Sequence, residues 1–78
     1  MINMNTLKGK RLSALLKGQL ASKGMSIRFV CDSIDRVIGY DTLAQIFRGE
    51  RGVSPDEASK IGAVIGLSRS KILSTLED

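Results

Sequence analysis

The chain has 78 residues, a formal net charge of +4 and 42% hydrophobic residues, with one cysteine and no histidine. This length allows a single small domain with a modest core, and this share of hydrophobic residues is typical of a folded domain. The lone cysteine excludes a disulfide within the chain, and the cysteine and histidine counts together exclude a Cys/His metal site.

Helical periodicity runs through almost the whole sequence, and the first predicted helix covers about residues 6–23. Its core face is a stripe of leucines at helical spacing: Leu12, Leu15, Leu16 and Leu20. Lys10 and Lys17 lie on the opposite side of this helix. Gly24 is the expected stop, because glycine adopts a positive φ at little cost.

The second helix is predicted over about residues 26–36, with Ser26 as its N-cap. Its apolar face falls at helical spacing and consists of Ile27, Val30, Cys31 and Ile34. In the turn that follows, Gly39 is expected to take a positive φ. Asp41 is the expected cap of a third helix over about residues 41–48.

The fourth helix, about residues 55–65, has the strongest start signal, because Ser54 and Glu57 in the stretch SPDE match a capping box. Ser68 is the expected cap of a fifth helix over about residues 69–77. The residues of the fifth helix expected to turn inward are Leu73 and Leu76. The residues expected to meet in the core are Ile34, Leu43, Ile46 and Ile61. The prediction is one compact all-α domain of five helices over residues 1–78.

The stretch MSIRFVCDSIDRVIGYDTLAQIFRGERGVSPDEASKIGAVIGLSRSKIL resembles the lambda-repressor-like helix-turn-helix domains, the Cro/CI or XRE-like group. The resemblance covers about residues 12–76. It implies five helices, of which the second and third form the DNA-reading unit. The sequence departs from the family pattern in three respects. About two extra residues stand between Ile34 and Ile38, and the usual glycine of the turn is replaced by Asp35, Arg36 and Val37. Phe47 replaces a frequent acidic residue near the end of the third helix.

The resemblance implies DNA contacts from the third helix and its surroundings. Gln45 has the side chain that pairs bidentately with adenine, and Arg48 can bind guanine or phosphate. Thr42 can contact a thymine methyl group or a phosphate. The candidates for phosphate contacts, which position a protein without reading sequence, are Arg28, Arg36, Tyr40 and Arg51.

These residues also have ordinary interpretations. Each arginine could be a solvated surface residue, and Arg51 could pair with Glu50 or Asp56. Tyr40 could pack the third helix onto the core. The basic residues of the first helix could serve only to solvate it, or the N-terminal arm with Lys8, Lys10 and Arg11 could reach back to the DNA backbone. Cys31 is interpreted as a packing residue.

The predicted function is a sequence-specific transcriptional regulator that binds double-stranded DNA, a Cro/CI-like repressor of the phage or mobile-element type. A homodimer on a two-fold-related operator is expected, because symmetric sites double the contacts of one small module. The N-terminus has no secretion signal and no apolar run approaches the roughly 20 residues that span a bilayer, so a cytoplasmic protein without membrane contact is expected.

No enzyme, cofactor or small-molecule substrate is expected, because the chain has no histidine to activate a nucleophile. The alternative function is a protein-binding module on the same fold, such as an antitoxin, an antirepressor or an inhibitor of host machinery. A fold alone does not decide function. The features that favour this alternative are the enlarged turn and the acidic residues around the second and third helices.

Overall fold

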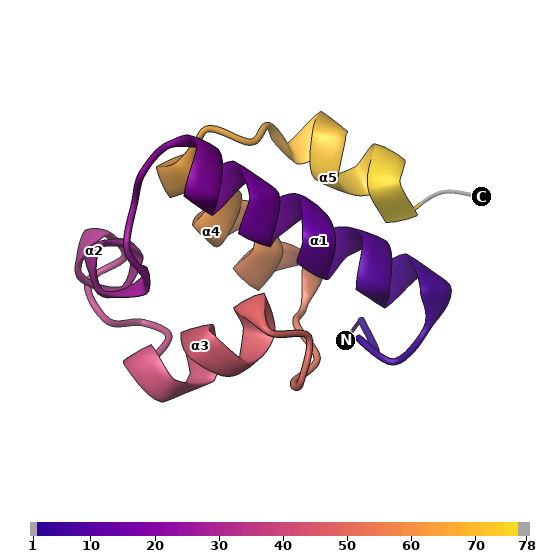
Figure 1. Cartoon of the computed structure of the whole chain (residues 1–78), viewed down its shortest axis with the longest axis horizontal. Helices are drawn as coiled ribbons and strands as arrows, with labels where there is room; N and C mark the ends of the chain where they lie inside the picture. Colours follow the sequence, from indigo (N-terminus) through magenta and orange to yellow (C-terminus); the bar gives the residue numbers. More distant parts are fainter. Residues whose placement is uncertain (1, 77–78) are drawn as a thin grey trace.

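Five helices make up the computed structural model of the chain, which describes residues 2–76 (Figure 1). They are α1 (Leu7–Ser22), α2 (Ile27–Ser33), α3 (Tyr40–Phe47), α4 (Pro55–Ile65) and α5 (Arg69–Leu76). Within the described range no residue belongs to a strand, and one isolated antiparallel bridge joins Ile2 to Val53. The prediction of an all-α domain with five helices is therefore confirmed.

The longest helix, α1, lies at the centre of the arrangement and packs against α3, α4 and α5. Figure 1 shows α5 running back alongside α1 on one side, with α3 on the other side. The short α2 is seen nearly end-on in this view and packs against α3 and α4. No described helix combines the length and the apolar character that crossing a membrane requires.

The core is purely apolar, and none of the described polar side chains is buried. Its largest fully buried side chains are Leu12, Leu16, Val30, Leu43, Ile46, Val53, Ile61, Ile65 and Ile72. Three of the four residues predicted to meet in the core are among them, but Ile34 is only partly buried against the cluster. The structure ends α2 at Ser33, so Ile34 sits at the helix end, where fewer neighbours can cover it.

The inward face of α5 differs from the prediction. Leu73 is 41% exposed, whereas the preceding Ile72 is buried. A Cβ added to Gly62 would lie 2.6 Å from Ile72 Cδ1, so α4 and α5 approach closely at this point. Ile72 takes the space that the missing side chain leaves, and the next residue along α5 turns toward solvent. Leu76 is half-buried against the core.

Three predicted helix caps, Ser26, Ser54 and Ser68, are confirmed by hydrogen bonds from backbone N–H groups to their side chains. Phe29 N donates to Ser26 Oγ over 3.0 Å, and Lys71 N donates to Ser68 Oγ over 3.1 Å. At α4 both bonds of the capping box are present: Glu57 N donates to the Ser54 hydroxyl, and Ser54 N donates to the Glu57 carboxylate. These bonds satisfy N–H groups that have no partner within the helix.

The turn between α2 and α3 does not have the predicted geometry. Gly39 has a φ of −66° and is itself the N-cap of α3, so Asp41 lies in the first turn of the helix and does not cap it. The positive φ values fall on Asp35 (55°) and Arg36 (57°). Arg36 N donates to Cys31 O, which closes the end of α2 and reverses the chain before it reaches Gly39.

An N-terminal arm, residues 2–5, packs onto the domain, an arrangement that was not predicted from the sequence. Ile2 N donates to Val53 O over 2.7 Å, and Val53 N donates back to Ile2 O over 3.2 Å. Met4 is buried in the core. Gly9 of α1 makes this packing possible, because a Cβ at this position would overlap the carbonyl oxygen of Asn3 and the Cα of Met4.

Candidate functional site

The short helix α3 has two contrasting faces. Its core face buries Leu43, Ala44, Ile46 and Phe47. The outward face carries Asp41, Gln45 and Arg48, which follow one another at helical spacing. Asp41 and Arg48 are exposed, whereas Gln45 is half-buried. Thr42, also half-buried, lies at the edge between the two faces, so α3 presents a narrow polar strip to solvent.

Two arginines follow α3, and only one of them has an acidic partner. Arg48 donates two hydrogen bonds to the Glu50 carboxylate from one edge of its guanidinium group, at 2.8 Å from Nε to Oε2 and 3.4 Å from Nη2 to Oε1. Arg51 is exposed and forms no ion pair with any described residue. The suggested pairing of Arg51 with Glu50 or Asp56 is therefore absent from the described part of the chain. Asp56 instead lies 3.9 Å from Arg69.

At the opposite end of α3, three predicted site residues meet in one surface pocket of about 510 Å³. We call it the corner pocket, because it lies where α2 leads into α3. Its lining residues are Arg28, Cys31, Asp32, Arg36, Gly39 and Tyr40. Tyr40 is 51% exposed, so it does not pack α3 onto the core as one interpretation suggested.

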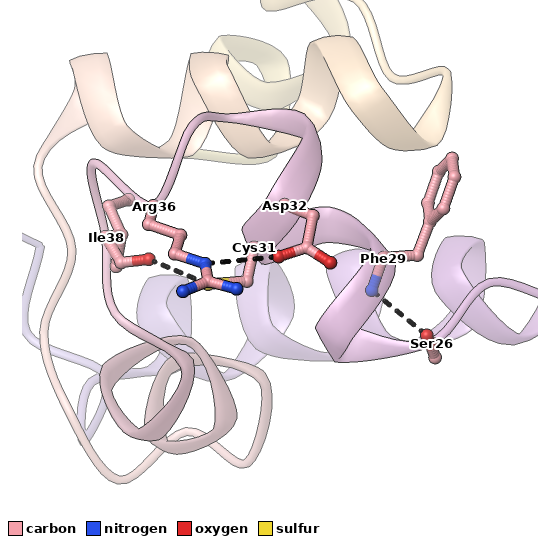
Figure 2. Close-up of polar contacts among 6 residues, drawn as sticks. All are labelled: Ser26, Phe29, Cys31, Asp32, Arg36 and Ile38. Carbon is pink, nitrogen blue, oxygen red and sulfur yellow. Dashed lines mark hydrogen bonds and ion pairs between the residues drawn. The ribbon is translucent and has the colours of Figure 1, made fainter.

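Two polar contacts link the end of α2 to the turn beside the corner pocket (Figure 2). Arg36 points back across the turn, and its Nε lies 3.3 Å from Asp32 Oδ1. The Cys31 thiol donates to Ile38 O over 3.5 Å and ties α2 to the segment that leads into α3. Cys31 is buried, in agreement with its interpretation as a packing residue. Arg28 is exposed and has no hydrogen-bond or ion-pair partner within residues 2–76.

The seven predicted site residues thus fall into three groups along α3. Arg28, Arg36 and Tyr40 meet at its N-terminal end. Thr42 and Gln45 lie within the helix. Arg48 and Arg51 follow its C-terminal end. All seven are at least partly accessible to solvent.

Three further exposed residues, on α2, in the turn and on α3, were not predicted as site residues. Asp41 was interpreted as a cap, but its carboxylate lies on the outward face of α3. Phe29 is 52% exposed on α2, and Val37 is 65% exposed in the turn. The exposure of Phe29 could have been found, because it falls outside the apolar face that Val30 defines with its helical neighbours. In Figure 2 the ring of Phe29 points away from the Arg36–Asp32 pair.

Among the described residues, no three histidine, cysteine or acidic side chains gather where they could hold a metal ion. No protein-family model, curated protein or solved structure matches this chain. Inference about function therefore starts from the chemistry of the strip along α3 and of the corner pocket.

Proposed function

We propose that this chain is a sequence-specific DNA-binding protein, a small transcriptional regulator in which α2 and α3 form a helix-turn-helix and α3 enters the major groove. The observation that carries the proposal is the division of α3, which commits one face to the core and leaves Gln45 and Arg48 on the other. A groove-reading helix needs both, because the core face fixes its pose and the polar face meets base edges.

The contacts divide into base readout and positioning. Gln45 pairs with the N6 and N7 positions of an adenine, and Thr42 contacts a neighbouring thymine methyl group or a phosphate. Arg28 and Arg51 bind phosphates and fix the register of the protein on the duplex. Both are exposed and unpaired within the described residues, so binding costs them no existing partner.

Arg48 and Arg36 each exchange an acidic partner for the polyanion. Their pairs with Glu50 and Asp32 are solvent-exposed, with more than half of each side chain accessible. Exposed ion pairs of this kind contribute about 0–1 kcal/mol, so the arginines can be recruited at small cost. The pairs also hold Arg48 near the end of α3 and Arg36 over α2, which limits the freedom of both side chains before binding.

Asp41 gives the outward face of α3 a carboxylate that repels phosphates and accepts a hydrogen bond from the N4 amino group of cytosine. Its place one helical turn before Gln45 suggests a cytosine next to the adenine that Gln45 reads. We expect a homodimer on a two-fold-related site, because one short helix makes few contacts. A small DNA-binding domain that acts as a homodimer resembles the Cro/CI-like repressors of phages and mobile elements.

The proposal is tested by selecting duplexes from a random library and measuring their affinities by fluorescence anisotropy at several salt concentrations. We expect the selected duplex to bind more tightly than a scrambled one. Arg28→Ala and Arg51→Ala should weaken binding to both duplexes and lower the salt slope by about one unit each. If no duplex is enriched and every slope stays near zero, the chain does not function through DNA.

A protein partner is the second candidate, because Phe29 of α2 and Val37 of the turn expose apolar side chains to solvent. Buried aromatic side chains are frequent anchors in protein interfaces. Under this alternative, Phe29→Ser would abolish partner binding and leave any weak DNA affinity unchanged. The same variant would be neutral if the chain acts through DNA alone.

A further inference from the structure

We infer that the corner pocket is a discrete binding site for a single phosphate group, whether a free monoester or a diester in a nucleic-acid backbone. The site goes beyond base reading by α3, and it does not depend on Gln45. It is formed by the short helix α2, the turn and the first residue of α3.

The charges around the corner pocket leave one positive charge uncompensated. Its lining includes two guanidinium groups, Arg28 and Arg36, and one carboxylate, Asp32. Asp32 already pairs with Arg36 at 3.3 Å, whereas Arg28 has no partner within the described residues. A phosphodiester carries one negative charge, so it would neutralise the pocket. The planar guanidinium of Arg28 can bind two phosphate oxygens at once.

The other walls of the corner pocket suit a tetrahedral anion with a substituent. Tyr40 contributes a hydroxyl that can donate to an oxygen and a half-exposed ring that can lie against a sugar or an ester group. Gly39 caps α3 without a side-chain hydrogen bond, so no side chain of the cap covers the pocket floor. A volume of about 510 Å³ exceeds the size of a phosphate and leaves room for its ester group.

The backbone of the turn helps to form the corner pocket. Asp35 and Arg36 both adopt positive φ, a conformation that is costly for residues other than glycine. This conformation turns the Arg36 side chain back over α2 toward Asp32 (Figure 2). The strained turn thus brings a second guanidinium group into the corner pocket.

Tyr40 provides a direct probe of the pocket, because the chain contains one tyrosine and no tryptophan. Its fluorescence is followed while inorganic phosphate or dimethyl phosphate is added at a constant ionic strength set with sodium chloride. We expect a saturable change with either phosphate and a negligible change with sodium acetate. Acetate has the same charge as the diester, so an equal response to acetate would overturn the assignment to phosphate.

Three variants test whether the response comes from the corner pocket. Arg28→Gln should weaken phosphate binding about tenfold, because it removes a charged hydrogen-bonding group. Arg69→Gln removes the same charge from α5, which packs against α1 and α4 only, and should leave binding unchanged. Asp32→Asn should tighten binding several-fold, because it removes the acid that competes for Arg36. A tightening cannot result from damage to the fold.

The source of the phosphate is decided by repeating the titrations with duplex DNA. If the pocket holds a backbone phosphate, Arg28→Gln weakens duplex binding and inorganic phosphate competes with the duplex. If duplex affinity is absent or insensitive to Arg28→Gln while free phosphate still saturates, the ligand is a free phosphate ester, and the inference stands without the DNA proposal. A Tyr40 signal that does not saturate, or equal effects of Arg28→Gln and Arg69→Gln, would overturn it.

Discussion

Two glycines of α1 should respond in opposite ways to the same substitution. Gly18 has open space where a Cβ would lie, so Gly18→Ala should raise the free energy of unfolding by about 0.5–1 kcal/mol, the usual gain within a helix. At Gly9 the same Cβ would overlap backbone atoms of Asn3 and Met4. Backbone atoms cannot move aside as a flexible side chain can, so the arm must shift.

The loss expected for Gly9→Ala follows from what the arm contributes. Met4 is buried, and complete burial of a methionine contributes about 1.5–3 kcal/mol. The two hydrogen bonds between Ile2 and Val53 contribute a further favourable term. Part of this loss of stability is offset, because a displaced arm gains conformational entropy. We therefore expect a net loss of about 1–3 kcal/mol, the range typical of overpacking.

Thermal unfolding followed by circular dichroism at 222 nm measures both variants. For a domain of this size, 1 kcal/mol corresponds to a change in Tm of about 4–8 °C. Gly9→Ala should therefore melt below the parent protein and Gly18→Ala above it. If both variants melt above the parent protein, the arm does not pack against Gly9, and the close approach described here is refuted.

Three further substitutions test other parts of the fold, each by urea unfolding. Ile46→Ala should cost about 2–5 kcal/mol because Ile46 is completely buried, and an unchanged midpoint would show that α3 does not dock on the core. Ser54→Ala removes the hydroxyl that accepts a hydrogen bond from Glu57 N and should cost about 1 kcal/mol. The control is Ser74→Ala at an exposed position of α5, and a smaller loss of stability for Ser54→Ala than for this control would contradict the capping role. Asp35→Gly should stabilise the protein by about 0.5 kcal/mol, because glycine relieves the positive φ; destabilisation would argue against that turn geometry.

The sequence predicted the parts of this fold that depend on local signals. Ser26, Ser54 and Ser68 each accept a hydrogen bond within their own helical turn, so a few residues suffice to locate the helix starts. The glycines that end α1 and α4, Gly24 and Gly66, adopt positive φ for the same local reason.

The parts that the sequence did not predict depend on contacts between distant segments. Met4 is buried because Gly9 lets the arm approach, and Ile2 pairs with Val53 across most of the chain, which no local pattern shows. Leu73 is exposed because its neighbour Ile72 occupies the gap above α4. These outcomes depend on how helices meet, and periodicity within one helix does not determine them.

For the candidate site too, the features set by local spacing were predicted from the sequence, and those set by the path of the turns were not. Helical spacing correctly put Gln45 and Arg48 on the outward face of α3. The pairing of Arg48 with Glu50 was missed, because two side chains at that separation meet only when the chain turns after the helix. The corner pocket was missed because Asp35 and Arg36 adopt a conformation that residues other than glycine seldom take.

The central claim, that α3 reads base sequence, is tested most directly by a ratio of affinities. The ratio is the Kd for a scrambled duplex divided by the Kd for the selected duplex, measured for the parent protein, Gln45→Ala and the control Ser70→Ala on α5. We expect Gln45→Ala to lose about 1–3 kcal/mol of discrimination and Ser70→Ala to lose none. A parent ratio near one, or a ratio that Gln45→Ala leaves unchanged, would contradict base reading by α3.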